Sequence, residues 1–334
     1  MGLYFFVAPI LNHIMHVFRD IPVVKSTAFP LISPGARPDS TRIESCKSGA
    51  SEELDMRLGR FQTGGQSRIG RFDGETVTDV TGEFDSFRDA LSRPEDASGI
   101  DGETFDVEEI THLPPTTERN TVFCAALNYE AHAEEGGQAV PERPLVFMKL
   151  PRTLVGHGQP INYHTRVTGE IDYEAELAAV IGTPARHVSA EEALDHVAGY
   201  TLLNDTSARD LQLGLQVGDD EMLDWFSGKT MEDTTPVGPS VVIDEIDDPQ
   251  DLSIESRVNG ETMQDDNTGM MIRSVADLVA FVSSRVRLTP GDIIATGTPE
   301  GVGTFQDIQL YPDDTVEIEI EDVGKLVNTV EEAE

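Results

Sequence analysis

Three acidic residues stand where two apolar stretches of the chain could bring them together. Glu174 and Glu176 lie two positions apart in the strand-like stretch 171–181, so their side chains would point to the same face. Asp205 follows the apolar stretch 199–204, at the point where a strand would end. Carboxylates aimed into one space repel each other unless a cation or a proton intervenes. An all-oxygen set of this kind indicates Mg²⁺, Mn²⁺ or Ca²⁺ rather than zinc.

Each acidic residue also has an ordinary structural explanation. Glu-x-Glu patterns arise by chance in so acidic a chain, as they do from Glu317 through Glu319 to Glu321. Asp205 precedes the segment 207–212, which has helical character, so its carboxylate could instead cap that helix. The residues alone leave both alternatives open.

His132 and Glu135 form a second candidate pair. They lie three residues apart, which places them on one face if the segment is helical. A carboxylate that touches an imidazole fixes its tautomer and makes it a better base. The alternative is a solvated helix face in a run of acidic residues.

Lysine is scarce, so the positions of two lysines are informative. Against 61 acidic residues among 334, the only lysines are Lys25, Lys47, Lys149, Lys229 and Lys325. Lys149 ends an apolar stretch, and Lys229 lies between Gly228 and Thr230. An ammonium is a compact point charge whose pKa can be lowered by burial, which suits an active site better than a guanidinium does.

The glycine-rich stretch 297–303 follows another apolar stretch and predicts a tight turn. It lacks the Gly-Lys-Ser/Thr ending of a phosphate-binding loop and the Rossmann spacing. Its amides and the Thr298 hydroxyl are candidates for binding a substrate carboxylate, although a plain turn needs no function.

Most elements that would position these residues are short strands. Alternation or apolar runs predict strands at 56–61, 67–72, 76–80, 121–127, 145–149, 171–181, 199–204, 293–296 and 315–320. Asp73-Gly74 predicts a hairpin turn, Ser189 with Glu192 a capping box, and 273–284 a helix. The pattern is typical of a mixed, β-rich α+β protein. Repeats and the long strand–helix alternation of a doubly wound sheet are absent from the sequence.

The composition excludes several classes of function. A net charge of −37 with 38% hydrophobic residues indicates a folded acidic protein, and distributed acidity with few lysines indicates a halophile's cytoplasmic protein. Such a chain is a poor partner for nucleic acids and for anionic membranes. Its two cysteines, Cys46 and Cys124, cannot build a disulfide framework or a cysteine-based zinc site.

Residues 1–55 differ from the rest, because they carry five basic and six acidic residues. The apolar stretch 3–18 is too short to span a bilayer, and signal-peptide features are not evident. We expect a disordered or mis-assigned extension over 1–55, with Met56 as the true beginning. A small N-terminal domain over 56–115 and a catalytic domain over 119–330 would follow, with Pro114-Pro115 between them.

Taken together, these motifs resemble the fumarylacetoacetate hydrolase family. The resemblance rests on an ordered set of segments: 128–132, 172–177, 199–210, 225–229, 258–261 and 290–301. It implies a β-roll catalytic domain preceded by a small α/β domain, usually dimeric, with Mg²⁺ or Mn²⁺ held by Glu174, Glu176 and Asp205. After Lys229 the family usually has Ser-Phe-Asp, whereas this chain has Thr230-Met231-Glu232, which leaves the pocket wall uncertain.

The resemblance also implies roles for the other candidates. His132 and Glu135 match the water-activating pair, and Lys229 matches the lysine that stabilises developing negative charge. The positions near the substrate are Lys149, Arg209, Gln212 and Thr298.

The expected reaction is hydrolysis of a C–C bond in an acylpyruvate-like 2,4-dioxo acid, through an enolate. The alternatives are decarboxylation or isomerisation of a related 2-oxo dioic acid, oxaloacetate decarboxylation among them. An alternative of another class is a 2-oxo-acid-binding protein without turnover.

Overall fold

Strands outnumber helices in the described part of the chain. The computed structural model describes residues 56–217 and 220–333. The extension predicted over 1–55 lies outside the described residues.

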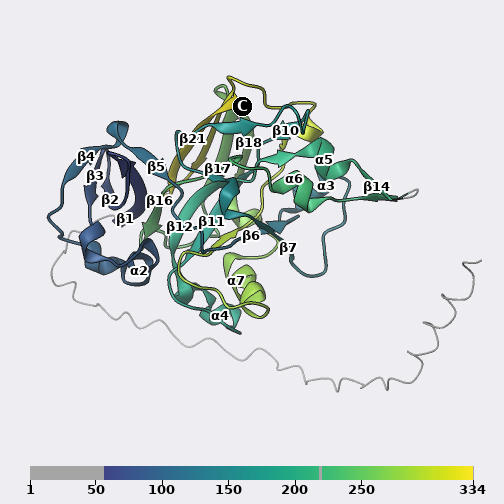
Figure 1. The fold of residues 1–334 in the computed structure, drawn as a ribbon. Coiled ribbons are helices and arrows are strands. Elements are labelled where there is room, and N and C mark those ends of the chain that lie inside the picture. The colour runs from purple at the N-terminus through teal and green to yellow at the C-terminus, as the bar shows by residue number, and fades with distance from the viewer. Residues whose placement is uncertain (1–55, 218–219, 334) are drawn as a thin grey trace, which may run out of the picture. The chain divides into compact units, whose positions relative to one another are not determined.

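A twelve-stranded mixed sheet dominates the structure (Figure 1). Ten of its strands follow one another in the order β4 (Thr104–Asp106), β3 (Thr76–Asp79), β2 (Gln66–Asp73), β1 (Met56–Thr63), β16 (Thr235–Ile243), β12 (Val197–Asn204), β11 (Ala175–Ile181), β19 (Ile293–Ala295), β6 (Val122–Ala126) and β7 (Leu145–Lys149). Two further strands pair off this path, β5 (Thr111–Leu113) with β1 and β8 (Leu154–Val155) with β16.

A second sheet has five strands, in the order β18 (Glu261–Asn267), β17 (Ser253–Val258), β20 (Thr315–Ile320), β21 (Gly324–Glu332) and β9 (Ile161–Tyr163). Two small pairs complete the strands, β10 (Ile171–Asp172) with β13 (Ser207–Ala208) and β14 (Leu215–Val217) with β15 (Asp220–Met222). Because β6 and β19, β8 and β16, and β9 and β21 pair in parallel, both larger sheets are mixed.

The helices are short. They are α2 (Phe87–Ser92), α3 (Glu130–Glu135), α4 (Ala190–Ala193), α5 (Arg209–Leu213), α6 (Trp225–Lys229) and α7 (Val275–Ser283). Single 3₁₀ turns span Thr81–Glu83, Pro94–Ala97, Val107–Glu109, Pro151–Thr153, Leu194–His196, Thr268–Met270 and Gly303–Phe305. Helices α3, α5 and α6 lie beside β6 and β7 (Figure 1).

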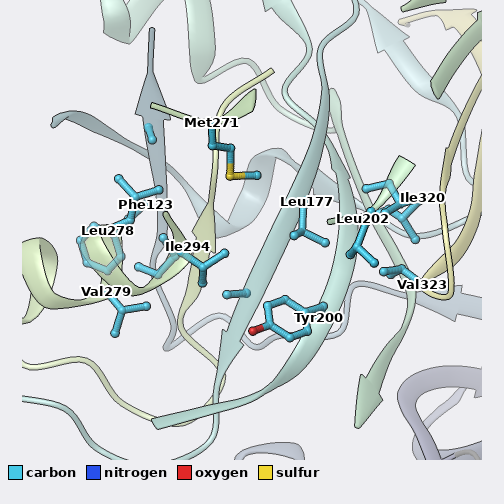
Figure 2. Packing of buried hydrophobic residues seen from close by; sticks show 14 of the residues in the cluster. Phe123, Leu177, Tyr200, Leu202, Met271, Leu278, Val279, Ile294, Ile320 and Val323 are labelled. Carbon is cyan, nitrogen blue, oxygen red and sulfur yellow. The ribbon is translucent and has the colours of Figure 1, made fainter. Parts of the chain in front are cut away.

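Strand β11 is buried along its whole length, and this makes it the rigid centre of the site described below. On one face Leu177 joins a cluster with Tyr200, Ile294 and Ile320 (Figure 2). On the other face its alanine and valine side chains pack into a second cluster. A strand covered on both faces reads as a continuous apolar run, which is why 171–181 lacks the alternation of a half-exposed strand.

Most of the predicted elements are confirmed. The hairpin at Asp73-Gly74 joins β2 to β3, the predicted capping box at Ser189 begins α4, and the predicted helix over 273–284 is α7. The predicted strand 171–181 is wrong in one respect, because it is broken at Tyr173 and Glu174 into β10 and β11. The mixed α+β class is confirmed.

The predicted N-terminal domain shares its sheet with the rest of the chain. Met56 of β1 pairs with Ile243 of β16, so the strands of 56–115 extend the sheet that contains β11. The domain boundary at Pro114-Pro115 stays a prediction.

A histidine pair joins this N-terminal part to the following segment. The ring of His112 on β5 stacks on Phe72 with 5.5 Å between centroids and meets His157 edge-on at 5.1 Å. Burial, and then the neighbouring His157, lower the pKa of His112 from 6.5 to about 4.

The free energy of unfolding should therefore depend on pH below 6.5. Between pH 6.5 and about 4, His112 binds a proton in the unfolded chain but not in the folded protein. The free energy of unfolding therefore decreases as the pH falls through this window. His112→Gln should make the slope shallower by up to about 1.4 kcal/mol per pH unit in denaturant titrations. His187→Asn, at an exposed histidine, is the control. Equal slopes for the two variants would contradict the assignment.

Candidate active site

The three acidic residues predicted from the sequence meet in the interior. Glu174 directly precedes β11, Glu176 lies within it, and Asp205 follows the end of β12. Each carboxylate places one oxygen within 4.8 Å of the others, and all three residues are buried.

Backbone contacts fix this convergence. The Asn204 side-chain oxygen accepts a hydrogen bond from the Glu174 amide at 2.9 Å, and the Asp205 amide donates to the Glu174 carbonyl at 2.9 Å. The break in the predicted strand thus turns Glu174 toward the chain that leaves β12.

Asp205 does not cap a helix, so that alternative is wrong. Helix α5 begins at Arg209, its N-cap is Ala208, and no side chain caps it. The predicted helical stretch 207–212 begins instead with the short strand β13. The Asp205 side chain is left to pair with cations.

Three buried cations surround the carboxylates. The Lys229 ammonium donates to Glu174 Oε2 at 2.8 Å and to Asp205 Oδ2 at 2.9 Å. Lys149 Nζ lies 2.7 Å from Asp205 Oδ1, and Arg209 Nη2 lies 2.7 Å from Glu174 Oε1. Glu176 receives only one hydrogen bond among those that the structure describes, from the Gly297 amide at 2.9 Å.

This asymmetry separates the pKa values of the two glutamates. Burial raises the pKa of Glu176 well above its usual value, and the Asp205 and Glu174 charges raise it further. Burial also opposes ionisation of Glu174, but Lys229 and Arg209 outweigh it and lower the pKa of Glu174. Burial alone would lower the pKa of Lys229, whereas the Asp205 and Glu174 charges raise it.

The donor set fits a divalent cation. Oxygen donors from Glu174, Glu176 and Asp205 are the ligands that Mg²⁺ and Mn²⁺ prefer. A cation beside Glu176 would also offset the repulsion that raises its pKa.

The histidine–glutamate pair is formed as predicted. His132 Nδ1 lies 2.7 Å from Glu135 Oε1 on α3, and both side chains are mostly buried, which argues against a solvated helix face. The second carboxylate oxygen of Glu135 accepts a hydrogen bond from the Gly301 amide at 3.0 Å. The glutamate is therefore held from two sides.

One cavity brings most of the candidates together. Its wall includes His132, the three acidic residues, Lys229, Arg209, Gln212 and Thr298. The Arg209 side chain donates to Asp172 at 2.8 Å and to Gln212 at 2.9 Å. The Thr298 hydroxyl accepts a hydrogen bond from Gln264 of β18 at 2.8 Å, which connects the second sheet to the cavity.

Like Glu135, Lys149 is a candidate that does not line the cavity. Its ammonium contacts Asp205 Oδ1, the Thr206 carbonyl at 3.0 Å and the Thr235 hydroxyl at 2.8 Å. Two of its three donors go to the threonine oxygens, and its charge pairs with the Asp205 carboxylate. The contacts place Lys149 behind Asp205, while its contact with substrate stays a prediction.

The glycine-rich loop binds carboxylates of the protein itself. Besides the Gly297 and Gly301 amides described above, the Gly303 amide donates to Asp172 at 2.8 Å. Gly297 has φ +91°, and a Cβ there would lie 2.8 Å from the Cβ of Asn128, so only glycine fits. The loop therefore positions the acidic side chains.

Sequence reasoning missed Asp172 and two aromatic residues. Asp172 binds Arg209 as well as the Gly303 amide, and it lies two positions before Glu174, so the alternation that singled out the glutamates could have found it. Phe147 and Trp225 also line the cavity. Phe147 lies two positions before Lys149, and Trp225 lies four positions before Lys229. This closeness in sequence to the two motif lysines was the available signal.

The comparison with known proteins agrees with this geometry. The family model for the fumarylacetoacetate (FAA) hydrolase C-terminal domain matches residues 121–331. The chain belongs to the fumarylacetoacetate hydrolase family.

Curated members of the family are similar over much of the chain. Fumarylacetoacetate hydrolase domain-containing protein 2 of Pongo abelii is 36% identical over 83% of this chain and 92% of its own. The oxaloacetate tautomerase YisK of Bacillus subtilis is 42% identical over 66% of this chain and 72% of its own. The human mitochondrial oxaloacetate tautomerase FAHD2A is 40% identical over 66% and 70%.

Solved family structures have the same fold. The fumarylacetoacetate hydrolase of Exiguobacterium antarcticum superposes with a TM-score of 0.70 at 34% identity, covering 83% of this chain and all of its own. The 2-hydroxyhepta-2,4-diene-1,7-dioate isomerase of Mycobacterium marinum gives 0.67 at 32%, covering 83% and 98%. Within the described part of the chain, no helix is long and apolar enough to cross a membrane.

The two lysines Lys149 and Lys325 offer a matched test of the buried network. Lys149→Met should lower the free energy of unfolding by about 3–5 kcal/mol, because it removes one partner of a buried ion pair. Lys325→Met should cost less than about 1 kcal/mol, because Lys325 is 43% exposed beside Glu317 and Glu319. Denaturant unfolding measures both, and equal losses would contradict the assignment.

Proposed function

We propose that this protein is a divalent-metal-dependent keto–enol isomerase of small 2-oxo acids, with oxaloacetate as the first substrate to assay. One observation carries the proposal: His132, Lys229 and the acidic cluster line a single cavity. The similarity to proteins named oxaloacetate tautomerase supports this reaction over the others open to the family.

Glu174, Glu176 and Asp205 would hold the cation, which we propose to be Mg²⁺ or Mn²⁺. When bound, such a cation supplies a Lewis acid that polarises the 2-oxo group and favours its enolate form. The oxygen donors of these residues are all buried, so water competes little for the site.

Lys229 adds a fixed positive charge at the same place. Its ammonium is buried and held by Glu174 and Asp205, so it needs no reorganisation when negative charge develops on the substrate. Preorganised charge of this kind is often the largest single contribution to catalysis.

His132 is the group that moves the proton. With Glu135 accepting a hydrogen bond from Nδ1–H, the other ring nitrogen is basic and can take a proton from C3 of the substrate. Returning that proton to the 2-oxygen completes the isomerisation, in which a C3–H bond breaks and an O–H bond forms.

Hydrolysis of an acylpyruvate-like acid is the second candidate. The same His132–Glu135 pair would activate water if a second carbonyl lay beside it, and the fold is shared with the maleylpyruvate hydrolase of Sphingobium at a TM-score of 0.68 and 27% identity. Decarboxylation of a 2-oxo dioic acid would also pass through an enolate, but it would not require an activated water. Assays on oxaloacetate, an acylpyruvate and an unsaturated 2-oxo dioate separate the three reactions.

The setting of the enzyme is part of the proposal. The net charge of −37 supports a cytoplasmic protein of a halophile, acting on small molecules rather than on nucleic acids or membranes. Family resemblance supports a homodimer.

Metal binding can be tested without turnover. Glu176→Gln should weaken Mn²⁺ binding by at least about tenfold, measured as free Mn²⁺ by electron paramagnetic resonance, because it removes one of three charged donors. Without metal the variant should be no less stable than the wild type, because a neutral amide avoids both the cost of burying a carboxylate and its repulsion from Asp205 and Glu174, the causes that raise the pKa of Glu176. Glu317→Gln, in the other Glu-x-Glu stretch, is the control. Unchanged Mn²⁺ affinity would remove Glu176 from the site.

The proton-transfer pair can be tested with neighbouring residues of α3. His132→Gln should lower kcat by about 10²–10⁴ and leave Mn²⁺ affinity within a few fold, since His132 is not among the three donors. Glu135→Gln should lower kcat less, whereas Glu134→Gln, at an exposed position, should leave it unchanged. Full turnover in His132→Gln would exclude His132 as the base.

A further inference from the structure

The wall of the cavity contains both charged and apolar side chains. The ionisable side chains among the described residues on its wall are His132, Glu174, Glu176, Asp205, Arg209 and Lys229. All of them belong to the acidic cluster, to the cations paired with it or to the histidine–glutamate pair. The rest of the described wall is mostly apolar, and its uncharged polar side chains are Gln138, Gln212, Thr298 and Thr304.

Two stacked aromatic rings form part of the apolar wall. Phe147 of β7 and Trp225, the first residue of α6, stack with 4.7 Å between ring centroids and 20° between planes. The Lys229 ammonium lies 5.4 Å from the Phe147 ring centroid, so the aromatic surface lies next to this cation. Both rings are only half-buried, which leaves part of their surface uncovered.

Other apolar side chains extend this wall. The Phe305 ring lies 6.3 Å from the His132 ring and is 42% exposed. Leu213 at the end of α5 and Leu223 before α6 also line the cavity. A group attached to C3 of the substrate would therefore meet rings and aliphatic side chains.

This wall is a poor match for a second carboxylate. Arg209 is already committed to Asp172, Glu174 and Gln212, and Lys229 is committed to Glu174 and Asp205. A charged group buried without a partner is costly. A flat apolar group instead gains from burial and from stacking on aromatic rings.

We propose that the preferred substrates are 2-oxo acids that carry a flat apolar group, such as an aryl ring, on C3. This inference rests on the proposed function and names its substrate class. The step is the same isomerisation: the C3–H bond breaks, the proton passes through His132 to the 2-oxygen, and no group leaves.

The test compares two probe substrates on the full-length protein loaded with Mg²⁺. The rates of enol–keto conversion of phenylpyruvate and of oxaloacetate are followed by their ultraviolet absorbance. We expect the ratio of kcat/KM for phenylpyruvate to that for oxaloacetate to exceed one. A ratio below one, with oxaloacetate turned over, would overturn this inference and leave the proposed function standing.

Variants of the aromatic wall test the cause of that ratio. Trp225→Leu should lower the ratio about tenfold, because it removes a stacking surface that only the aryl group uses. A merely structural effect would lower both activities equally. Phe226→Leu on the same helix is the control, since Phe226 is 72% exposed and does not line the cavity. If Trp225→Leu fails to fold, Phe147→Leu replaces it, and an unchanged ratio would overturn the proposal.

Binding is measured separately from turnover. Trp225 is the only tryptophan of the chain, so tryptophan fluorescence reports directly on this wall. Phenylpyruvate should quench it in the metal-loaded protein at lower concentration than oxaloacetate does. If neither acid is turned over, the proposed function fails, while selective quenching by phenylpyruvate would still support the apolar subsite and its absence would overturn it.

Discussion

The site depends on a buried balance of charge. Asp172, Glu174, Glu176 and Asp205 are held in the interior against Lys149, Lys229 and Arg209. Isolated ions of this kind could not be buried, because the cost of removing each from water is several kcal/mol after relaxation. Four carboxylates against three cations leave one negative charge in excess, and the carboxylate with the fewest donors is Glu176. A divalent cation beside Glu176 would offset this excess negative charge.

The sheets supply the rigidity that such a balance needs. Strand β11 is packed on both faces, so Glu176 cannot move away from its neighbours. Gln264 of the second sheet accepts a hydrogen bond from the Ala175 amide at 3.0 Å and donates one to Thr298, so a single side chain ties both sheets to the cavity. The Asp172 carboxylate joins two further segments, because it accepts hydrogen bonds from Arg209 and from the Gly303 amide. Small displacements would break several charge-assisted bonds together.

The parts that the sequence could predict are those set by local pattern. Alternation and apolar runs identified the strands, Ser189 with Glu192 identified a capping box, and spacing identified the Glu174–Glu176 and His132–Glu135 pairs. Long-range contacts were not predictable in this way. The three bonds of Lys149 come from residues more than fifty positions away, and spacing does not reveal which of two scarce lysines faces the cavity.

The scarcity of lysine acquires a physical meaning from this arrangement. In roughly 1 M salt the screening length falls to about 3 Å, so an exposed pair such as Lys325 with Glu317, 3.4 Å apart, contributes little. Buried pairs are screened much less. Lys149 and Lys229 are almost completely buried, so salt screens their contacts with Asp205 less than it screens the exposed pair. A surface with few lysines can therefore coexist with a site that requires lysine, because salt screens exposed charges more than buried ones.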